Sequence, residues 1–374
     1  MNNKVFFIIF ISIWLIIIIL NFIWPKQIFS QEENRMLATV PSFSLESFID
    51  GKYLNSMNDY INDHFAFRNF YLKLNSWWEV NVLNKKENNG VYIGNDGYLF
   101  EKIDNVDIDN TYKNAEVIDT FAKKMKAKNI PTYFLLIPNS IYINSDKLPD
   151  NVIPPDQEYT INEVYNRTNN CININIVDKL KEENKKIELY FKTDHHINSN
   201  GAFVIYSEFC RQTGKKIIDI NEFEVRTLTN EFLGTFDSKA QILGQEKDTI
   251  TVYENEINTD IKEAIYDKET TNSLFNEEYL SVKDKYSYFL NGNNSKAVIK
   301  TKVNNDKKLL VIKDSYAHIM SQFLCEEYSE VHFLDPRYTN FDYEDYITEN
   351  GITDVMFLYN VSTFEKDVSI KNIN

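Results

Sequence analysis

The first clear pattern along the chain is an unbroken apolar run from Val5 to Ile23. Its nineteen residues carry no charge and would form a helix about 28 Å long, close to the thickness of a bilayer's hydrocarbon core. Trp24 follows where an interfacial aromatic ring would lie. A cleaved signal peptide is the alternative, but it would have a shorter apolar region and small residues at its cleavage site. The run therefore predicts an uncleaved signal anchor at residues 1–24.

The chain after the anchor divides by its pattern into a linker, residues 25–50, and one large domain, residues 51–374. Apolar side chains at helical spacing predict helices over 53–84. Residues 90–100 alternate around Asn95-Asp96-Gly97, which is a strong signal for a hairpin turn.

Strands and helices then alternate along most of the domain. The pattern predicts strands at 131–138, 187–192, 308–314, 330–335 and 353–360, and helices at 111–128, 157–185, 199–213, 315–328 and 342–351. Residues 219–304 lose the pattern and are polar and extended, so we expect an insertion there. The alternation predicts an α/β fold, a three-layer sandwich in which helices cover both faces of a mainly parallel sheet.

Charge and cysteine content exclude several classes of protein. The net charge of −15 argues against nucleic-acid binding, for which a basic face would be expected. The three cysteines, an odd number, cannot form a complete disulfide framework, and no C-x-x-C motif occurs. We expect Cys171, Cys210 and Cys325 to be small buried side chains. We expect no cofactor.

Two polar clusters follow predicted strands, at the sheet edge where α/β proteins bind ligands. Ser315, in Lys313-Asp314-Ser315-Tyr316, would lie at the N-terminus of a helix, where free N–H groups and the helix dipole stabilise a developing oxyanion. The alternative is that Ser315 or Asp314 only caps the helix.

The second cluster is Thr193-Asp194-His195-His196. In extended backbone Asp194 and His196 project to the same side, so the aspartate could orient an imidazole that takes a proton from a hydroxyl. A purely structural pair is equally compatible with this pattern. A metal site on Asp194, His195 and His196 is a further alternative, but no other histidine cluster would complete it, so we expect no metal.

Several short motifs resemble the DHHW family of exported bacterial proteins. They are, in chain order, Glu33-Asn34-Arg35, Asp63-His64-Phe65 with Phe67-Arg68, Gly94 to Phe100, Thr193 to His196, Tyr286 to Asn293, Lys313 to Ala317 and Asp335 to Tyr338. This family is similar to the alginate O-acetylation proteins, which carry an SGNH-hydrolase-like domain. The resemblance implies that fold, with the Asp-x-His element before the serine rather than after it.

The resemblance also implies a function. Ser315 would be the nucleophile, His196 the general base and Asp194 the residue that orients it, in a membrane-anchored O-acetyltransferase or acetylesterase acting on cell-surface polysaccharide. Its domain would be extracellular, and a multi-span membrane acyltransferase would supply the acetyl groups. From their positions, Asn293 and Arg337 are candidates to bind the oxyanion or substrate.

The sequence departs from the family pattern at two positions, and two other functions are alternatives to the one that the resemblance implies. Ile197 stands where the motif has Trp, and Lys313 where glycine is common in related enzymes. A non-catalytic glycan-binding or assembly component is the main alternative, and a metal phosphoesterase is another.

Overall fold

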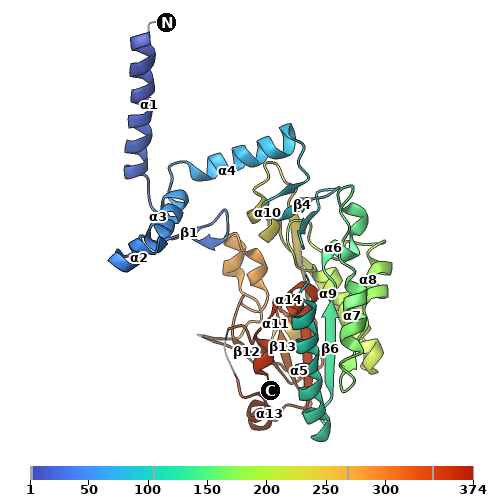
Figure 1. The fold of residues 1–374 in the computed structure, drawn as a ribbon. Helices are drawn as coiled ribbons and strands as arrows, with labels where there is room; N and C mark the ends of the chain where they lie inside the picture. Colours follow the sequence, from blue (N-terminus) through green and yellow to red (C-terminus); the bar gives the residue numbers. More distant parts are fainter. Residues whose placement is uncertain (1–2, 104–105, 268, 339–340, 374) are drawn as a thin grey trace. The chain divides into compact units, whose positions relative to one another are not determined.

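The computed structural model describes residues 3–103, 106–267, 269–338 and 341–373 of the chain (Figure 1). The chain forms two compact units, which are described separately. The smaller comprises residues 1–89 and 237–245, and the larger comprises residues 90–236 and 246–374.

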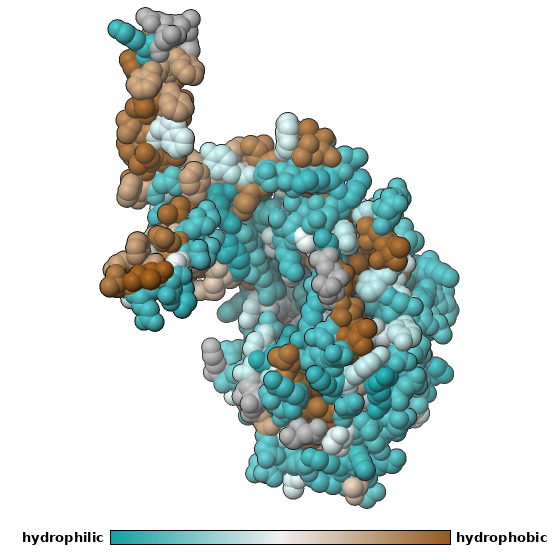
Figure 2. Space-filling view, viewed as in Figure 1, coloured by the Kyte–Doolittle hydropathy of each residue, from teal (hydrophilic) through white to brown (hydrophobic). Residues whose placement is uncertain are grey.

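The smaller unit begins with the apolar helix α1 (Asn3–Ile23), whose exposed apolar side chains cover it along its length (Figure 2). Its length and composition fit a signal anchor, as the sequence predicts. The elements that follow are β1 (Phe29–Ser30), β2 (Arg35–Met36), α2 (Leu45–Ile49), α3 (Lys52–Asp63), α4 (Arg68–Trp77), a π-helical turn (Trp78–Val82) and β3 (Glu87–Asn88).

The larger unit is built on a sheet of eight strands in the order β11-β10-β12-β14-β13-β15-β6-β7. The strands β14, β13, β15, β6 and β7 run parallel, and β12, β10 and β11 continue the sheet in antiparallel pairing. The bounds are β6 (Thr132–Ile137), β7 (Ile172–Asn173), β10 (Glu263–Tyr266), β11 (Thr270–Thr271), β12 (Lys296–Lys300), β13 (Lys308–Lys313), β14 (Glu330–Leu334) and β15 (Asp354–Asn360).

Helices cover both faces of this sheet (Figure 1). Side chains alternate along β6, so that Leu135 joins one hydrophobic core and Phe134 joins the other. The first core contains residues of α9 (Ser199–Thr213) and α12 (Tyr316–Leu324). The second contains residues of α5 (Ile108–Ala127), α7 (Gln157–Tyr165), α13 (Tyr343–Asn350) and α14 (Val361–Lys366). The predicted three-layer α/β sandwich is confirmed.

The remaining elements are short or lie outside the sheet. They are the hairpin of β4 (Val91–Ile93) and β5 (Leu99–Glu101), the hairpin of β8 (Glu224–Phe232) and β9 (Asp248–Glu254), and the helices α6 (Ser140–Ile143), α8 (Val177–Glu183), α10 (Thr235–Ala240) and α11 (Glu256–Thr259). The first hairpin turns at Asp96 and Gly97, both with positive φ, as the sequence predicts.

Three segments differ in detail from the sequence pattern. Residues 187–192 form no strand of the sheet and make only an isolated bridge between Tyr190 and Ile197. The region 157–185 is two helices with the short strand β7 between them. Residues 219–304, expected to be an insertion, contribute three strands to the main sheet as well as the β8–β9 hairpin.

Candidate active site

Ser315 lies between the end of β13 and the start of α12, at the carboxyl end of a central strand. Its side chain makes no capping bond to the helix. Asp314 fills that role instead, since its Oδ1 accepts a hydrogen bond of 2.8 Å from the backbone N–H of Tyr316. The Ser315 hydroxyl is thereby left for other chemistry.

The structure brings Ser315, His196 and Asp194 together. His196 Nε2 lies 2.8 Å from Ser315 Oγ, and His196 Nδ1 lies 2.5 Å from Asp194 Oδ1. The Asp194 and His196 side chains are buried. This is the arrangement of a serine-histidine-aspartate triad, in which the carboxylate fixes the imidazole tautomer and the imidazole takes the hydroxyl proton.

The Asp194 carboxylate is equipped to stay ionised. Burial raises its pKa, but the nearby imidazoles of His195 and His196, the hydrogen bond from His196 and that from the Thr235 backbone outweigh burial, so the net pKa lies well below the usual range. Two backbone N–H groups also donate to it, from His196 at 3.0 Å and from Thr235 at 2.7 Å. An ionised Asp194 stabilises the imidazolium that forms when His196 accepts a proton.

A glycine packs directly on the orienting aspartate. A Cβ atom at Gly234 would lie 2.3 Å from the Asp194 Cβ and 2.4 Å from its Oδ2, so only glycine fits. The Gly234 N–H donates to Thr193 Oγ1 at 3.0 Å. Asp248 in turn accepts hydrogen bonds from the backbone N–H groups of Lys192 and Thr193 and from the Thr193 hydroxyl, at 2.6–2.8 Å.

Gly234, Thr235 and Asp248 all come from the segment 219–304, and sequence reasoning missed them. Gly234 is one of 10 glycines, and nothing in its neighbourhood distinguishes it. Its role depends on a contact with a residue forty positions earlier.

Tyr286 supports the histidine from its other side. Its ring stacks on the His196 ring with centroids 3.6 Å apart and an interplanar angle of 9°. Its hydroxyl donates to the backbone carbonyl of Ser315 at 3.0 Å. Tyr286 therefore contacts both the His196 ring and the Ser315 backbone. The sequence pointed to it only as part of a family motif, without a role.

Next to Ser315, Asp314 connects the ends of β13 and β15. Its Oδ2 accepts hydrogen bonds from the backbone N–H and the side-chain amide of Asn360, at 2.8 and 2.7 Å. Asn360 in turn accepts a hydrogen bond from Asn139. Burial raises the pKa of Asp314 to about 6. These bonds fix the backbone that carries Ser315 against β15.

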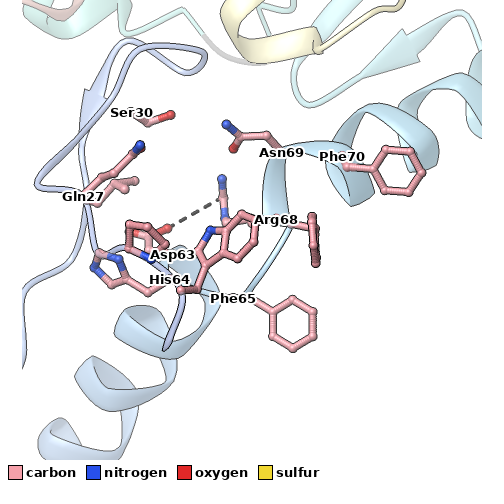
Figure 3. Close-up of a pocket in the computed structure, with 12 residues that line it drawn as sticks. Gln27, Ser30, Asp63, His64, Phe65, Arg68, Asn69 and Phe70 are labelled. Atoms are coloured by element: carbon pink, nitrogen blue, oxygen red, sulfur yellow. Dashed lines mark ion pairs between the residues drawn. The ribbon is translucent and has the colours of Figure 1, made fainter. Parts of the chain in front are cut away.

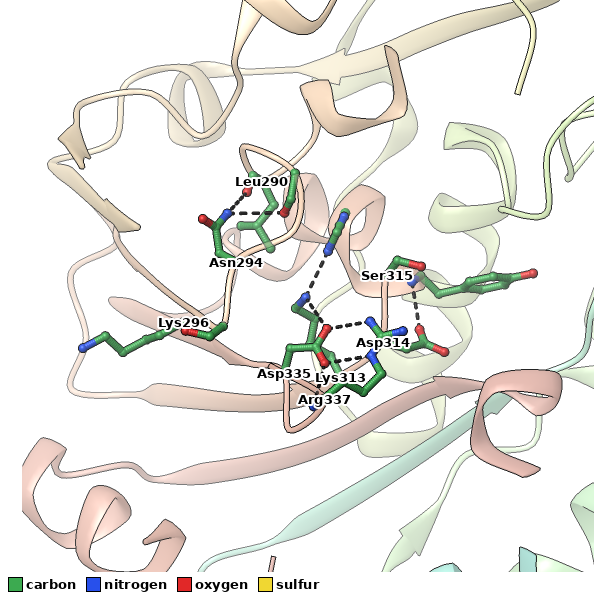
Figure 4. Close-up of polar contacts among 12 residues, drawn as sticks. Leu290, Asn294, Lys296, Lys313, Asp314, Ser315, Asp335 and Arg337 are labelled. Carbon is green, nitrogen blue, oxygen red and sulfur yellow. Dashed lines mark hydrogen bonds and ion pairs between the residues drawn. The ribbon is translucent and has the colours of Figure 1, made fainter. Parts of the chain in front are cut away.

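Arg337 is held in an ion cluster beside the nucleophile's strand (Figure 4). It binds both carboxylate oxygens of Asp335, at 2.8 and 2.6 Å, and Lys313 lies 3.3 Å from the same carboxylate. Burial lowers the pKa of Lys313 and lowers that of His318 well below its usual range, so the neutral His318 ring can accept the 3.0 Å bond from Lys313. Lys313 thus serves as a buried ionic contact.

The structure does not bring Asn293 to the triad. Asn293 is exposed and lines a cavity of about 550 Å³ together with Tyr266 and Tyr279. None of the hydrogen bonds among the described residues joins Asn293 or Arg337 to Ser315 or His196.

The metal alternative has a geometric basis at this site, since Asp194, His195 and His196 offer three ligand atoms within 4.8 Å of one another. The two ring nitrogens of His196, however, already face Asp194 and Ser315. His195 is the outer member, 32% exposed and 3.6 Å from Asp194 Oδ1. This geometry matches a proton-transfer site.

Residues 85–334 match the family model described as DHHW protein. The chain belongs to the DHHW family. Among solved structures, this DHHW protein is similar to a DHHW family protein from Eubacterium siraeum, with 22% identity and a TM-score of 0.64 over 76% of this chain and 96% of that chain. It is equally similar to Bacillus cereus PatB1, at 22% and 0.64 over 75% of this chain and 98% of that one.

PatB1 has also been solved with a sulfonyl adduct, and that structure matches with 22% identity and a TM-score of 0.62 over 75% of this chain and 99% of that chain. At this level of identity the likeness shows the fold. The comparison with curated proteins finds no match.

In this DHHW protein the fourth position of the motif is Ile197, which is fully buried. It belongs to the same hydrophobic core as Leu189 and Ala202, and its backbone forms the isolated bridge to Tyr190. The side chain after the base thus packs the protein interior. With Ile at this position, the contacts among Asp194, His196 and Ser315 are present.

Proposed function

We propose that this protein is a membrane-anchored, extracytoplasmic O-acetyltransferase acting on a cell-surface polysaccharide, with Ser315, His196 and Asp194 as its catalytic residues. The observation that carries the proposal is the continuous chain of short contacts from Ser315 Oγ through His196 to Asp194. A serine at the start of a helix, paired to an oriented imidazole, suits acyl transfer through a covalent intermediate.

In the first half-reaction, Ser315 Oγ attacks the carbonyl carbon of an acetyl donor while His196 Nε2 takes the hydroxyl proton. The tetrahedral intermediate collapses, the bond to the leaving group breaks, and His196 returns the proton to that group. In the second half-reaction a sugar hydroxyl attacks the acetyl-serine, and its proton passes to His196 and then to Ser315 Oγ. Water in place of the sugar would make the same site an acetylesterase.

Backbone groups around Ser315 favour a developing oxyanion. The N–H groups of Tyr316, Ala317 and His318 donate to Asp314 and to the Ser315 carbonyl. Among the described residues of this first turn, the Ser315 N–H is then the donor available to substrate. The positive end of the α12 dipole lies at the same place, so we infer that the oxyanion binds at this N–H. Asn293 and Arg337 stay predictions as donors.

The proposed location is supported by the length and composition of α1. In the proposed orientation, α1 is a single span and the larger unit is outside the cell, where it would meet envelope polysaccharide but no cytoplasmic acetyl donor. We therefore infer that a multi-span membrane acyltransferase delivers the acetyl group.

Hydrolysis of 4-nitrophenyl acetate by the full-length protein in detergent tests the catalytic residues. We expect Ser315→Ala and His196→Ala to lose at least about 10³-fold in kcat, as removal of triad members does elsewhere. The exposed serine variant Ser145→Ala is the matched control and keeps full activity. A sulfonyl fluoride should modify Ser315 in the wild type, detected by peptide mass spectrometry, and this modification should disappear in His196→Ala.

Equal turnover in all four proteins, with no adduct on Ser315, would overturn the catalytic assignment and favour a glycan-binding component. If the triad is active, adding acetylated donor with polysaccharide fragments distinguishes transfer from hydrolysis. Acetyl appearing on the glycan supports the transferase, and acetate released at the same rate with and without glycan supports the esterase.

A further inference from the structure

Within the smaller unit, the corner between α3 and α4 is bound to the end of α1. The Asn21 side-chain oxygen, in the last turns of α1, accepts a hydrogen bond of 2.9 Å from the backbone N–H of Ala66. Lys26 donates to the backbone carbonyls of both Asn21 and His64, at 2.9 and 3.2 Å. The Trp24 ring packs against the Phe67 ring with centroids 4.3 Å apart and the ring planes tilted by 50°. His64 and Phe67 belong to a motif that the catalytic site does not use.

This attachment determines how deep the corner lies if α1 spans a bilayer. The helix Lys4–Ile23 is 20 residues long, so it extends about 30 Å and matches the hydrocarbon core. Asn21 precedes the end of α1 by two residues, which is roughly 3 Å along the axis. Since Ala66 binds Asn21 directly, the corner lies at the boundary between hydrocarbon and headgroups.

The side chains exposed at this corner suit that layer. Phe65 and Phe67 flank Ala66 and are 37% and 45% exposed. Phe67 adopts a left-handed backbone, with φ of 60°, which is rare for a bulky residue. Aromatic rings concentrate at the interfacial layer of membranes, where an apolar body meets polar headgroups.

Helix α4 continues the same surface and runs across the direction of α1 (Figure 1). Phe70, Leu74 and Trp77 of α4 and Trp78, the first residue of the π-helical turn that continues it, have the i, i+4, i+7, i+8 spacing of one helix face, and all four are exposed. The opposite face is turned inward, because the Ser76 hydroxyl is buried and donates to the Ala240 carbonyl of the same unit. An exposed apolar face on a helix of this kind is typical of a helix that lies in the plane of a membrane surface.

The charged residues near the corner neutralise one another. Arg35 binds Asp63 at 2.5 Å, and Arg68 binds Glu33 while lying 3.7 Å from Asp63. Figure 3 shows the ion pair of Arg68 and Asp63 in a pocket of about 280 Å³, with the rings of Phe65 and Phe70 pointing away from that ion pair. Two carboxylates and two guanidiniums therefore add no net charge that would keep the corner out of the headgroup layer.

We propose that the α3–α4 corner and the outer face of α4 (Phe70, Leu74, Trp77 and Trp78) lie in the interfacial layer of the bilayer that α1 spans. The proposal rests on the membrane anchoring included in the proposed function. It assigns the Glu33-Asn34-Arg35 and Asp63-to-Arg68 motifs a role as a membrane-surface platform. This platform would hold the residues that follow α1 at a fixed depth in the membrane surface. A flexible linker after α1 would not fix their depth.

Tryptophan quenching tests this directly, because the chain's 4 tryptophans are Trp14, Trp24, Trp77 and Trp78. Full-length protein is placed in phosphatidylcholine nanodiscs with or without brominated acyl chains, which quench tryptophans that contact them. The double variant Trp14→Phe/Trp24→Phe reports on α4, and Trp24→Phe/Trp77→Phe/Trp78→Phe reports on the middle of α1. Activity towards 4-nitrophenyl acetate, relative to wild type, confirms that each variant is folded.

Quenching of both reporters is the expected result. In the α4 reporter, Leu74→Glu should reduce the quenching because it places a charge on the lipid face. The matched control Asn69→Glu, on another side of the helix, should leave it unchanged. If only Trp14 is quenched, α1 spans the bilayer but the interfacial platform is overturned, and a protein partner becomes the better occupant of that face. If Trp14 is not quenched either, the membrane anchoring of the proposed function fails as well.

Discussion

Replacing Gly234 with alanine should impair catalysis without changing any catalytic residue. The new Cβ would lie 2.3 Å from the Asp194 Cβ, whereas ordinary contacts begin at 3.4 Å, so Asp194 must retreat by about 1 Å. Misplacement of a catalytic group by that amount costs on the order of 10²-fold in rate. Overpacking of this kind also destabilises a fold by about 1–3 kcal/mol. We therefore expect kcat to fall about 10²-fold while the protein remains folded.

The assay is 4-nitrophenyl acetate hydrolysis, normalised to folded protein by circular dichroism. Asp194→Asn sets the lower limit, since loss of the orienting carboxylate costs about 10⁴-fold in a triad. Gly214→Ala is the matched control. It lies at the C-terminal end of α9 with φ of 68° and open space around it, so it should lose about 1 kcal/mol of stability and no activity. Wild-type kcat and stability in Gly234→Ala would refute the idea that this close approach positions Asp194.

Three further outcomes are expected. Tyr286→Phe keeps the ring on His196 but loses the hydrogen bond to the Ser315 carbonyl, so kcat should fall several-fold. Tyr286→Leu also loses the ring and should lower kcat further. If both variants have the wild-type kcat, Tyr286 does not position the site. Burial raises the pKa of Glu326 to about 7. As pH rises from about 4.5 to 7, the unfolded chain loses this proton before the folded protein does, so wild-type stability falls. Glu326→Gln has no such group. In urea unfolding, the free energy of unfolding of Glu326→Gln minus that of wild type should therefore be up to about 3 kcal/mol larger at pH 8 than at pH 5. A chelator should leave ester hydrolysis unchanged, whereas loss reversed by a divalent cation would favour the metal phosphoesterase.

The sequence was most informative where a residue's role follows from its immediate neighbours. The strand ending at Lys313 and the helix starting at Tyr316 are both marked by strong apolar patterns, so the position of Ser315 between them could be predicted. Asp194 and His196 could be paired because a spacing of two residues puts their side chains on one side of the chain. Their meeting with Ser315 across 119 positions was implied by family resemblance alone.

The errors in the predicted elements have local physical causes. Residues 187–192 have strand composition, but the chain reverses after Phe191 and Tyr190 bridges to Ile197 instead of to the sheet. In the region 157–185, the first helix ends near Asn166. The chain then pairs with β6 through Ile172 and Asn173 before the next helix begins. Short strands of two residues leave too little periodicity to be read from a sequence.

Tertiary contacts account for what the sequence could not indicate. The closeness of Gly234 to Asp194 and the stacking of Tyr286 on His196 join residues tens of positions apart. Residues 219–304 are polar on average, yet Ala297 and Ile299 of β12 are buried beside β14. Antiparallel strands at the margin of a parallel sheet lack the crossover helices by which β-α-β units are recognised.

The two parts of the proposed triad are carried by different kinds of support. Ser315 follows a strand in the middle of the sheet, whereas Asp194 and His196 belong to a turn that is held by hydrogen bonds, one donated by the Thr235 N–H and others accepted by the Asp248 carboxylate. Loosening that turn would silence the serine while leaving the sheet intact. If the proposed function holds, reactivity can therefore be lost or retuned through changes in the β8–β9 region, far along the chain from Ser315.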